Sequence, residues 1–219
     1  MSLQNLRQSR YRFLILLGLI LGLFVIEPIM KRFVAGHIFL SIFETAIVIS
    51  MAYAVSNKKN YLIVGVFLAV VMLASLWITY ASPNKSITAI GMIAGALLVV
   101  LVIINLVDIV LKSTEVTREI VHVAVLLYLL IGLLWAFLYM FIEIVDPTSF
   151  NVELIHPERD FLVFQYYSFV TLTTLGFGDI VPVTGEAKSL TVLEALVGQL
   201  YLVVAIAWLV GMHVSRRPK

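Results

Sequence analysis

The chain has 219 residues, of which 62% are hydrophobic and 13% are charged, and its mean hydropathy is +1.07. Soluble proteins carry about 25% charged residues, so this composition excludes a soluble globular domain and predicts several membrane-spanning segments. The formal net charge of +2 is too small to indicate a nucleic-acid partner. Because cysteine is absent, the sequence offers neither a disulfide framework nor a thiolate site.

Hydropathy predicts six spanning helices, at residues 13–30, 37–56, 61–80, 87–111, 120–142 and 190–211. The first follows three arginines, but no small-residue cleavage site comes after it, so we expect a retained span rather than a signal peptide. With both termini on the cytoplasmic side, ten lysines and arginines lie inside and five lie outside. The positive-inside rule therefore predicts this orientation in a cytoplasmic (inner) membrane.

Between the fifth and sixth spans lies a segment that is too short to cross a membrane. Residues 145–160 are polar and predict an extracellular turret. The fourteen residues 160–173 are apolar and aromatic, which is typical of a re-entrant helix. Asp160 would complement the positive N-terminal end of that helix, and the partial negative charge at the other end would stabilise a cation.

The re-entrant helix leads into Thr-Leu-Thr-Thr-Leu-Gly-Phe-Gly-Asp at residues 171–179, which makes little sense as packing. Closely spaced glycines matter where the chain must adopt positive φ angles. If Gly176 and Gly178 are left-handed while Leu175 and Phe177 are right-handed, successive carbonyl groups turn to one side of the chain. The stretch resembles the selectivity filter of tetrameric potassium channels, in the Gly-Phe-Gly variant rather than the commoner Gly-Tyr-Gly.

The resemblance covers about residues 112–215 and implies an outer helix, a pore helix, a filter and an inner helix. It implies that potassium is bound by the Thr174 hydroxyl and by carbonyl oxygens along Thr174, Leu175, Gly176, Phe177 and Gly178. Asp179 would form a ring of four carboxylates at the outer mouth. Tyr166 and Tyr167 fall where relatives carry an aromatic cuff that braces the filter, although Phe177 cannot donate a hydrogen bond to that cuff. One filter strand cannot encircle an ion, so a homotetramer is expected.

The last predicted span carries the remaining candidates. Gly198 matches the hinge glycine of the relatives' inner helices, with close helix packing as the alternative. One helical face, which we assign to the cavity and inner gate, carries Gln199, Leu202, Ile206 and Val210. Glu194 is an ionisable group inside a span, and we expect it to hydrogen-bond behind the filter.

Other ionisable residues have a structural interpretation beside the functional one. Asp108 is predicted to pair with Lys112 at i,i+4. Glu44 is expected to pair with a basic residue among Lys31, Arg32 and His37. His122 and His213 fall at the inner interface, where each is either a proton switch or a plain interfacial histidine. His156 lies near Glu153, Glu158 and Asp160, a set that predicts a solvated turret rather than a metal site.

These observations predict an all-α membrane protein with four N-terminal transmembrane helices at residues 1–111. A pore domain at residues 112–219 would add two helices, a re-entrant pore helix and a selectivity filter. The predicted function is passive potassium conduction, without enzymatic activity, cofactor or nucleic acid, and with lipid and further copies of the chain as partners. A weakly selective cation channel and a non-conducting membrane sensor or partner subunit remain as alternatives. Because residues 87–111 contain no lysine or arginine, we expect no steep voltage gating.

Overall fold

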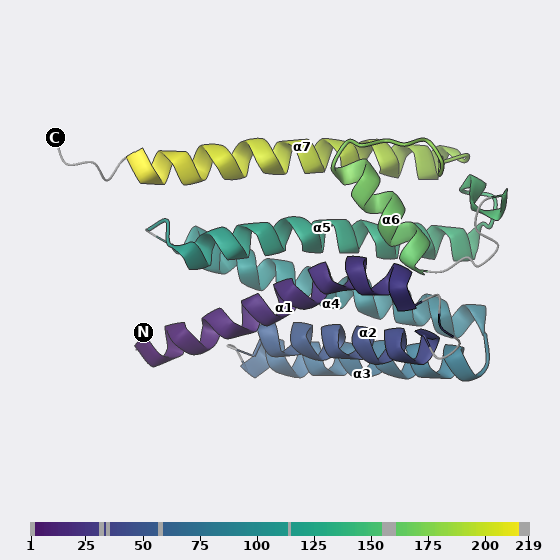
Figure 1. Ribbon diagram of the computed structural model, residues 1–219, viewed down its shortest axis with the longest axis horizontal. Helices are drawn as coiled ribbons and strands as arrows, with labels where there is room; N and C mark the ends of the chain where they lie inside the picture. Colours follow the sequence, from purple (N-terminus) through teal and green to yellow (C-terminus); the bar gives the residue numbers. More distant parts are fainter. Residues whose placement is uncertain are drawn as a thin grey trace. The chain divides into compact units, whose positions relative to one another are not determined.

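A computed structural model describes the backbone of residues 3–30, 33, 36–56, 59–113, 115–154 and 161–214. Side chains at 3–10, 28, 37, 153–154 and 212–214 also lie outside the description. The helices of the described residues are α1 (Leu3–Met30), α2 (Gly36–Ala54), α3 (Lys59–Ala81), α4 (Lys85–Leu111), α5 (Arg118–Val145), the 3₁₀ turn η1 (Asn151–Leu154), α6 (Phe161–Leu172) and α7 (Gly185–Val214) (Figure 1). This helix content confirms the predicted all-α class.

Four described helical segments are long and apolar enough to cross a membrane: Lys59–Ala81, Lys85–Leu111, Arg118–Val145 and Gly185–Gly211. Two shorter apolar segments, Ile38–Ala54 and Phe161–Leu172, accompany them. The chain is therefore a multi-pass membrane protein, while the count of six spans stays a prediction. The first helix begins at Leu3, ten residues before the predicted start, so the N-terminal arginines belong to α1.

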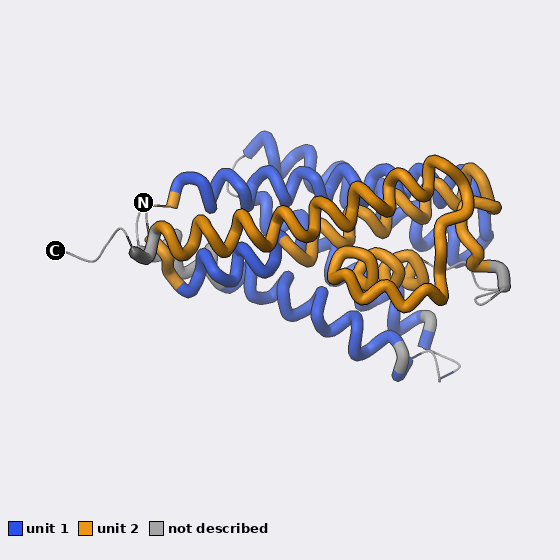
Figure 2. Tube along the Cα trace, turned by 90° about the horizontal axis from the view of Figure 1, so that it is seen from above, with its two compact units in different colours: residues 1–112, 118–127 blue, residues 113–117, 128–219 orange. Residues whose placement is uncertain are grey.

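The chain divides into two compact units, shown in different colours in Figure 2. Unit 1 contains Met1–Lys112 and Arg118–Leu127, and unit 2 contains Ser113–Thr117 and Tyr128–Lys219. The helix α5 belongs to both, since its first ten residues cluster with unit 1 and its remainder with unit 2.

Unit 1 is a helical bundle in which α3 packs on α4, α1 packs on α2, and α2 also contacts α3 and α4. Small residues let α3 and α4 approach closely, because a Cβ at Gly91 would lie within 3 Å of the Ser75 side chain. The Ser75 hydroxyl donates to the Ile87 carbonyl at 2.6 Å, so this buried polar group is satisfied. The interior face of α4 includes Leu98 and Val102, both fully buried.

Arg12 lies inside unit 1, with 5% of its surface exposed, although the sequence placed it before the first span. Its guanidinium donates to the Ser56 hydroxyl at 2.7 Å and lies 5.4 Å from the centroid of the Tyr53 ring. A hydrogen bond and a cation–π contact offset part of the cost of burying this charge. A hydropathy profile does not register such contacts, because Tyr53 belongs to α2 and Ser56 to the turn that follows it.

The predicted pair at the end of α4 is confirmed, since Lys112 Nζ lies 2.7 Å from Asp108 Oδ1. For Glu44, the expected partners Lys31 and Arg32 and the side chain of His37 lie outside the described residues.

Candidate functional site

The short helix α6 runs obliquely between α5 and α7 within unit 2 (Figure 1). Gly132 allows α5 to approach it, because a Cβ there would lie 2.8 Å from the Phe169 ring. The Ser168 hydroxyl bonds the Gly132 carbonyl at 2.7 Å, and the Tyr128 hydroxyl donates to the Leu172 carbonyl at 3.1 Å. The helix spans twelve residues, close to the predicted re-entrant segment, whose Asp160 lies outside the described residues.

The backbone after α6 alternates in handedness. The φ angle is +61° at Thr174, +53° at Gly176 and +77° at Gly178, whereas Leu175 and Phe177 keep negative φ. The positive φ expected at the two glycines is confirmed. Thr174 is the only non-glycine residue with positive φ in the described part of the chain, and its residue type does not predict this angle, because β-branched residues disfavour that region.

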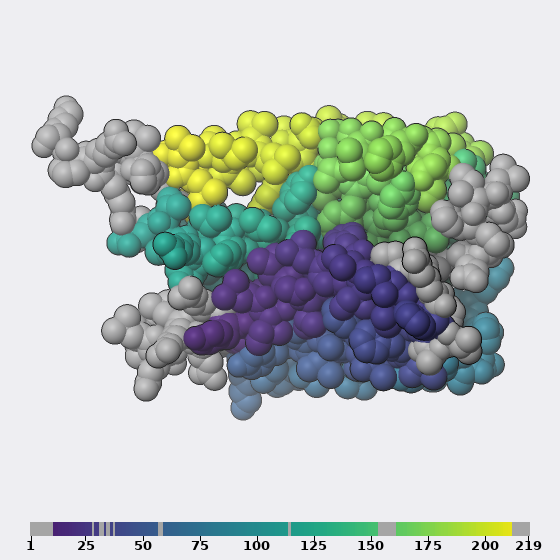
Figure 3. Space-filling model, in the orientation of Figure 1, coloured from purple at the N-terminus to yellow at the C-terminus, as the bar shows by residue number. Residues whose placement is uncertain are grey.

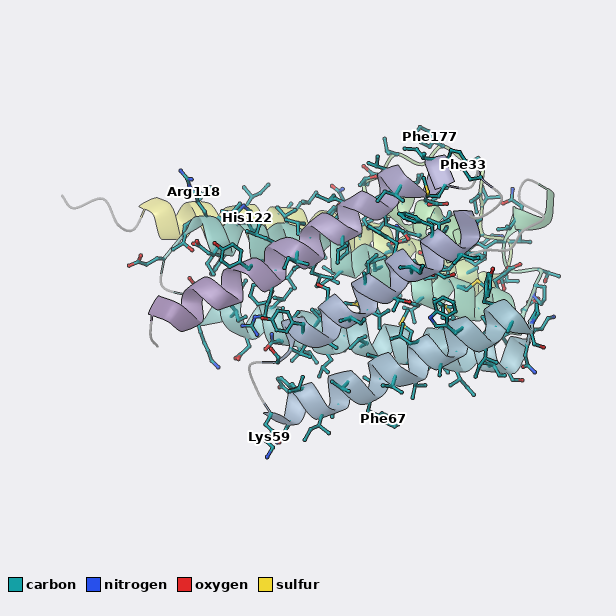
Figure 4. All side chains as sticks on the ribbon, turned by 60° about the horizontal axis from the view of Figure 1, so that its bottom comes forward. Phe33, Lys59, Phe67, Arg118, His122 and Phe177 are labelled. Carbon is teal, nitrogen blue, oxygen red and sulfur yellow. The ribbon has the colours of Figure 1, made fainter. Side chains whose placement is uncertain are left out.

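Hydrogen bonds to the end of α6 hold this turn. The Val170 carbonyl accepts from the amide of Leu175 at 2.9 Å and from the amide of Gly176 at 3.2 Å. The side chains of Leu175 and Phe177 are 59% and 66% exposed in the single chain, and Figure 4 labels Phe177. The alternating segment is therefore anchored at its start and uncovered along its length.

Asp179, directly after the alternating segment, is bonded to Tyr166 of α6, one of the two tyrosines that the sequence singled out. The Tyr166 hydroxyl donates to Asp179 Oδ2 at 2.7 Å. This hydrogen bond raises the pKa of the Tyr166 phenol to about 12. The Tyr167 hydroxyl instead lies 2.7 Å from the Thr191 hydroxyl of α7.

Tyr167 also belongs to a buried aromatic cluster beside α6. Its ring centroid lies 5.0 Å from that of Tyr139 and 5.3 Å from that of Phe150, and Phe150 also packs on Phe164 at 5.4 Å. Such spacing is typical of favourable aromatic pairs. Phe150 is 3% exposed, so this part of the predicted polar turret is packed against α6 instead of lying in solvent. The sequence signal that was missed is the single aromatic residue in an otherwise polar segment.

Glu194 is fully buried and hydrogen-bonds side chains of α5 and α6, while its predicted position behind a filter stays a prediction. The Tyr139 hydroxyl of α5 lies 2.5 Å from Glu194 Oε2, and the Ser168 hydroxyl of α6 lies 2.5 Å from Glu194 Oε1. Ser168 has one hydroxyl proton but faces two oxygens, Oε1 and the Gly132 carbonyl. Each contact is a full two-centre hydrogen bond when Glu194 Oε1 carries a proton and donates it to the Ser168 hydroxyl, which then donates to the Gly132 carbonyl. The geometry thus favours a neutral acid that links three helices.

Gly198 lies against the end of α6. A Cβ at this position would lie 2.6 Å from the Leu172 carbonyl oxygen and 2.9 Å from Leu172 Cδ1. The glycine therefore has a packing role, and the hinge role stays a prediction. The face assigned to the cavity is exposed in the single chain: Gln199, Leu202, Ile206 and Val210 all lie on the surface of α7, drawn in yellow-green to yellow in Figure 3.

The remaining ionisable candidates add no site among the described residues. No group of three metal-ligating side chains occurs within the described part of the chain. His156, Glu158 and Asp160 lie outside it, as do the side chains of Glu153 and His213. His122 lies near the start of α5, and Figure 4 labels it.

Comparison with known families bears on the part of the chain that carries these features. Residues 123–214 match the ion channel family model. The matched region includes most of α5 and all of α6, the alternating segment and α7. The match supports an ion channel function and points away from an enzyme. No curated protein and no solved structure matches the chain.

Proposed function

We propose that four copies of this chain form a passive, potassium-selective channel in a cytoplasmic membrane, with both termini on the cytoplasmic side. The observation that carries the proposal is the alternating backbone at residues 174–178. Positive φ at residues 174, 176 and 178, with negative φ at the two residues between them, is the alternation that would turn successive carbonyl groups to one side. A stack of such oxygens can replace the hydration shell of a potassium ion.

Exposure of the filter and of α7 supports assembly of several copies. Leu175 and Phe177 are large apolar side chains that are more than half exposed in the single chain. Residues along α7 are similarly exposed, and only 11% of its spanning window is buried. Four copies around a common axis would surround the ion with carbonyl groups and leave Gln199, Leu202 and Ile206 to line the cavity.

The hydrogen bonds around the filter have a role in this proposal. A selective filter must keep its oxygens at fixed distances even when an ion leaves, so its backbone needs support from the surrounding helices. Tyr166 would hold the outer mouth through Asp179, and Glu194 would hold the pore helix through Ser168. In the tetramer, four Asp179 carboxylates would concentrate cations at the entrance.

Flux from liposomes loaded with potassium, run in parallel with sodium, tests the proposal. The proposal expects rapid potassium efflux and little sodium efflux. Comparable flux of both ions would favour the weakly selective cation channel, which is compatible with phenylalanine at position 177 in place of the commoner tyrosine. Absence of flux from a correctly assembled protein would favour the sensor or partner subunit instead.

A matched pair of glycine substitutions then tests the filter. Gly176→Ala should abolish selective flux, because a Cβ on a left-handed residue costs about 1–2 kcal/mol and turns a carbonyl away from the axis. Gly185→Ala is the control, since a Cβ at either glycine meets nothing within 4 Å, but only Gly176 has positive φ. Assembly should survive in both variants. Normal potassium flux in Gly176→Ala would remove the filter assignment.

A further inference from the structure

The segment between α5 and α6 contains a short element that contacts the chain beyond the filter. We call residues 149–152 the outer bracket. Ser149, Phe150 and Val152 are at most 3% exposed, although this segment lies in the connection between α5 and α6. Phe150 forms an isolated antiparallel bridge with Pro182, so the outer bracket runs alongside the residues that follow Asp179.

Asn151 supplies the side chain that faces this segment. Its Oδ1 accepts from the Val181 amide at 2.6 Å, and its Nδ2 donates to the Asp179 carbonyl at 3.2 Å. Its backbone amide donates to the Val181 carbonyl at 3.2 Å. A carboxamide has a donor and an acceptor side by side, and here they bond the two backbone groups that flank Ile180.

Building on the proposed channel function, we propose that Asn151 is a positioning residue for the outer mouth of the filter. Tyr166, on the pore helix, holds the Asp179 side chain. Asn151, in the segment that precedes the pore helix, holds the Asp179 backbone carbonyl. The outer bracket is itself held by the aromatic cluster through Phe150. Asp179, the residue that follows Gly178, is therefore held through its side chain and through its backbone, and this would limit how far the neighbouring carbonyl groups of the filter can turn.

The proposal can be tested with two Asn151 variants and a control in the same segment. Asn151→Leu keeps the shape but removes both side-chain bonds, and Asn151→Asp keeps the acceptor for the Val181 amide. Thr148→Val is the matched control, because its hydroxyl bonds Asp146 and contributes no bond to residues 179–183. The full-length protein is used throughout.

Site-resolved hydrogen exchange is the first measurement. Losing one intramolecular hydrogen bond should speed exchange of the Val181 amide about tenfold in Asn151→Leu. Exchange in Asn151→Asp and Thr148→Val should stay close to that of the wild type. An unchanged Val181 exchange rate in Asn151→Leu would overturn the proposal. Should that variant fail to assemble, loss of Val181 protection in Asn151→Asp would overturn it equally.

The ratio of potassium to sodium flux is the second measurement, because a purely structural role would not change it. The ratio should fall in Asn151→Leu and remain unchanged in Thr148→Val. Faster exchange with an unchanged flux ratio would overturn the positioning role. If the wild type carries no flux at all, the channel proposal fails, and hydrogen exchange still decides by itself whether Asn151 restrains the outer mouth.

Discussion

Replacing Gly198 by alanine separates the packing role of this residue from a hinge role. The added Cβ would lie 2.6 Å from the Leu172 carbonyl oxygen, whereas ordinary contact begins at 3.4 Å. The difference means that α6 and α7 must separate locally by about 0.8 Å. The contacted atom belongs to the backbone, so no side chain can rotate to relieve the clash. Leu172 is the last residue of α6 and lies two residues before Thr174. A shift of the Leu172 backbone would therefore also move the start of the proposed filter.

Two opposing contributions set the change in stability caused by Gly198→Ala. Overpacking costs about 1–3 kcal/mol, and replacing glycine by alanine inside a helix recovers up to about 1 kcal/mol. Gly211→Ala, in the same helix with nothing within 4 Å of its added Cβ, receives only the helix term. The two alanine variants should therefore differ by about 1–3 kcal/mol in stability, with Gly198→Ala the less stable.

Thermal unfolding in detergent and ion flux in liposomes together measure this difference. We expect Gly198→Ala to melt below the wild type and to lose part of its preference for potassium, whereas Gly211→Ala should melt at or slightly above the wild type and keep its selectivity. The packing argument is refuted if Gly198→Ala melts at or above the wild type and conducts with unchanged selectivity. A change confined to open probability would then establish the hinge.

Three further predictions concern α7 and unit 1. Gln199→Leu should reduce single-channel conductance in planar bilayers, because Gln199 is the one polar residue on the cavity face, and unchanged conductance would place it outside the conduit. Glu194→Gln should preserve thermal stability, since an amide repeats the donor and acceptor of a neutral acid. Glu194→Leu should cost about 1–3 kcal/mol, because it removes the carboxyl group that bonds the buried Tyr139 and Ser168 hydroxyls, and a Gln variant as unstable as Leu would indicate a charged Glu194. Macroscopic conductance should vary weakly between about −100 and +100 mV, because each charge crossing the field supplies about 2.3 kcal/mol per 100 mV. Asp108 is the only charged residue within residues 87–111. A conductance that rises steeply with voltage, together with a gating current, would contradict this expectation.

The sequence by itself determined the features that depend on a residue and its near neighbours. Apolar stretches of sufficient length predicted the helices α3, α4, α5 and α7, because hydropathy is a property of the local chain. The positive φ angles of Gly176 and Gly178 followed from the freedom of residues without a Cβ. The pair Asp108–Lys112 followed from helical spacing alone.

Tertiary structure decided which distant residues meet. Glu194 was recognisable as a polar group in an apolar span, but its partners Tyr139 and Ser168 lie 55 and 26 residues away, and only helix packing brings them together. Gly198 likewise acquired its packing role from the approach of Leu172. The burial of Arg12 depends on the position of a second helix, which periodicity within α1 does not encode.

The proposed filter and the outer bracket also combine features set by the local sequence with features set by tertiary contacts. Local preference disfavours positive φ at Thr174, so that angle exists because the Val170 carbonyl holds the two amides that follow. Asn151 belongs to a polar segment and had no local signal to distinguish it from its neighbours. Its side-chain bonds exist because folding brings residues 179–181 alongside it, and the energy of those bonds depends on positions that no local pattern specifies.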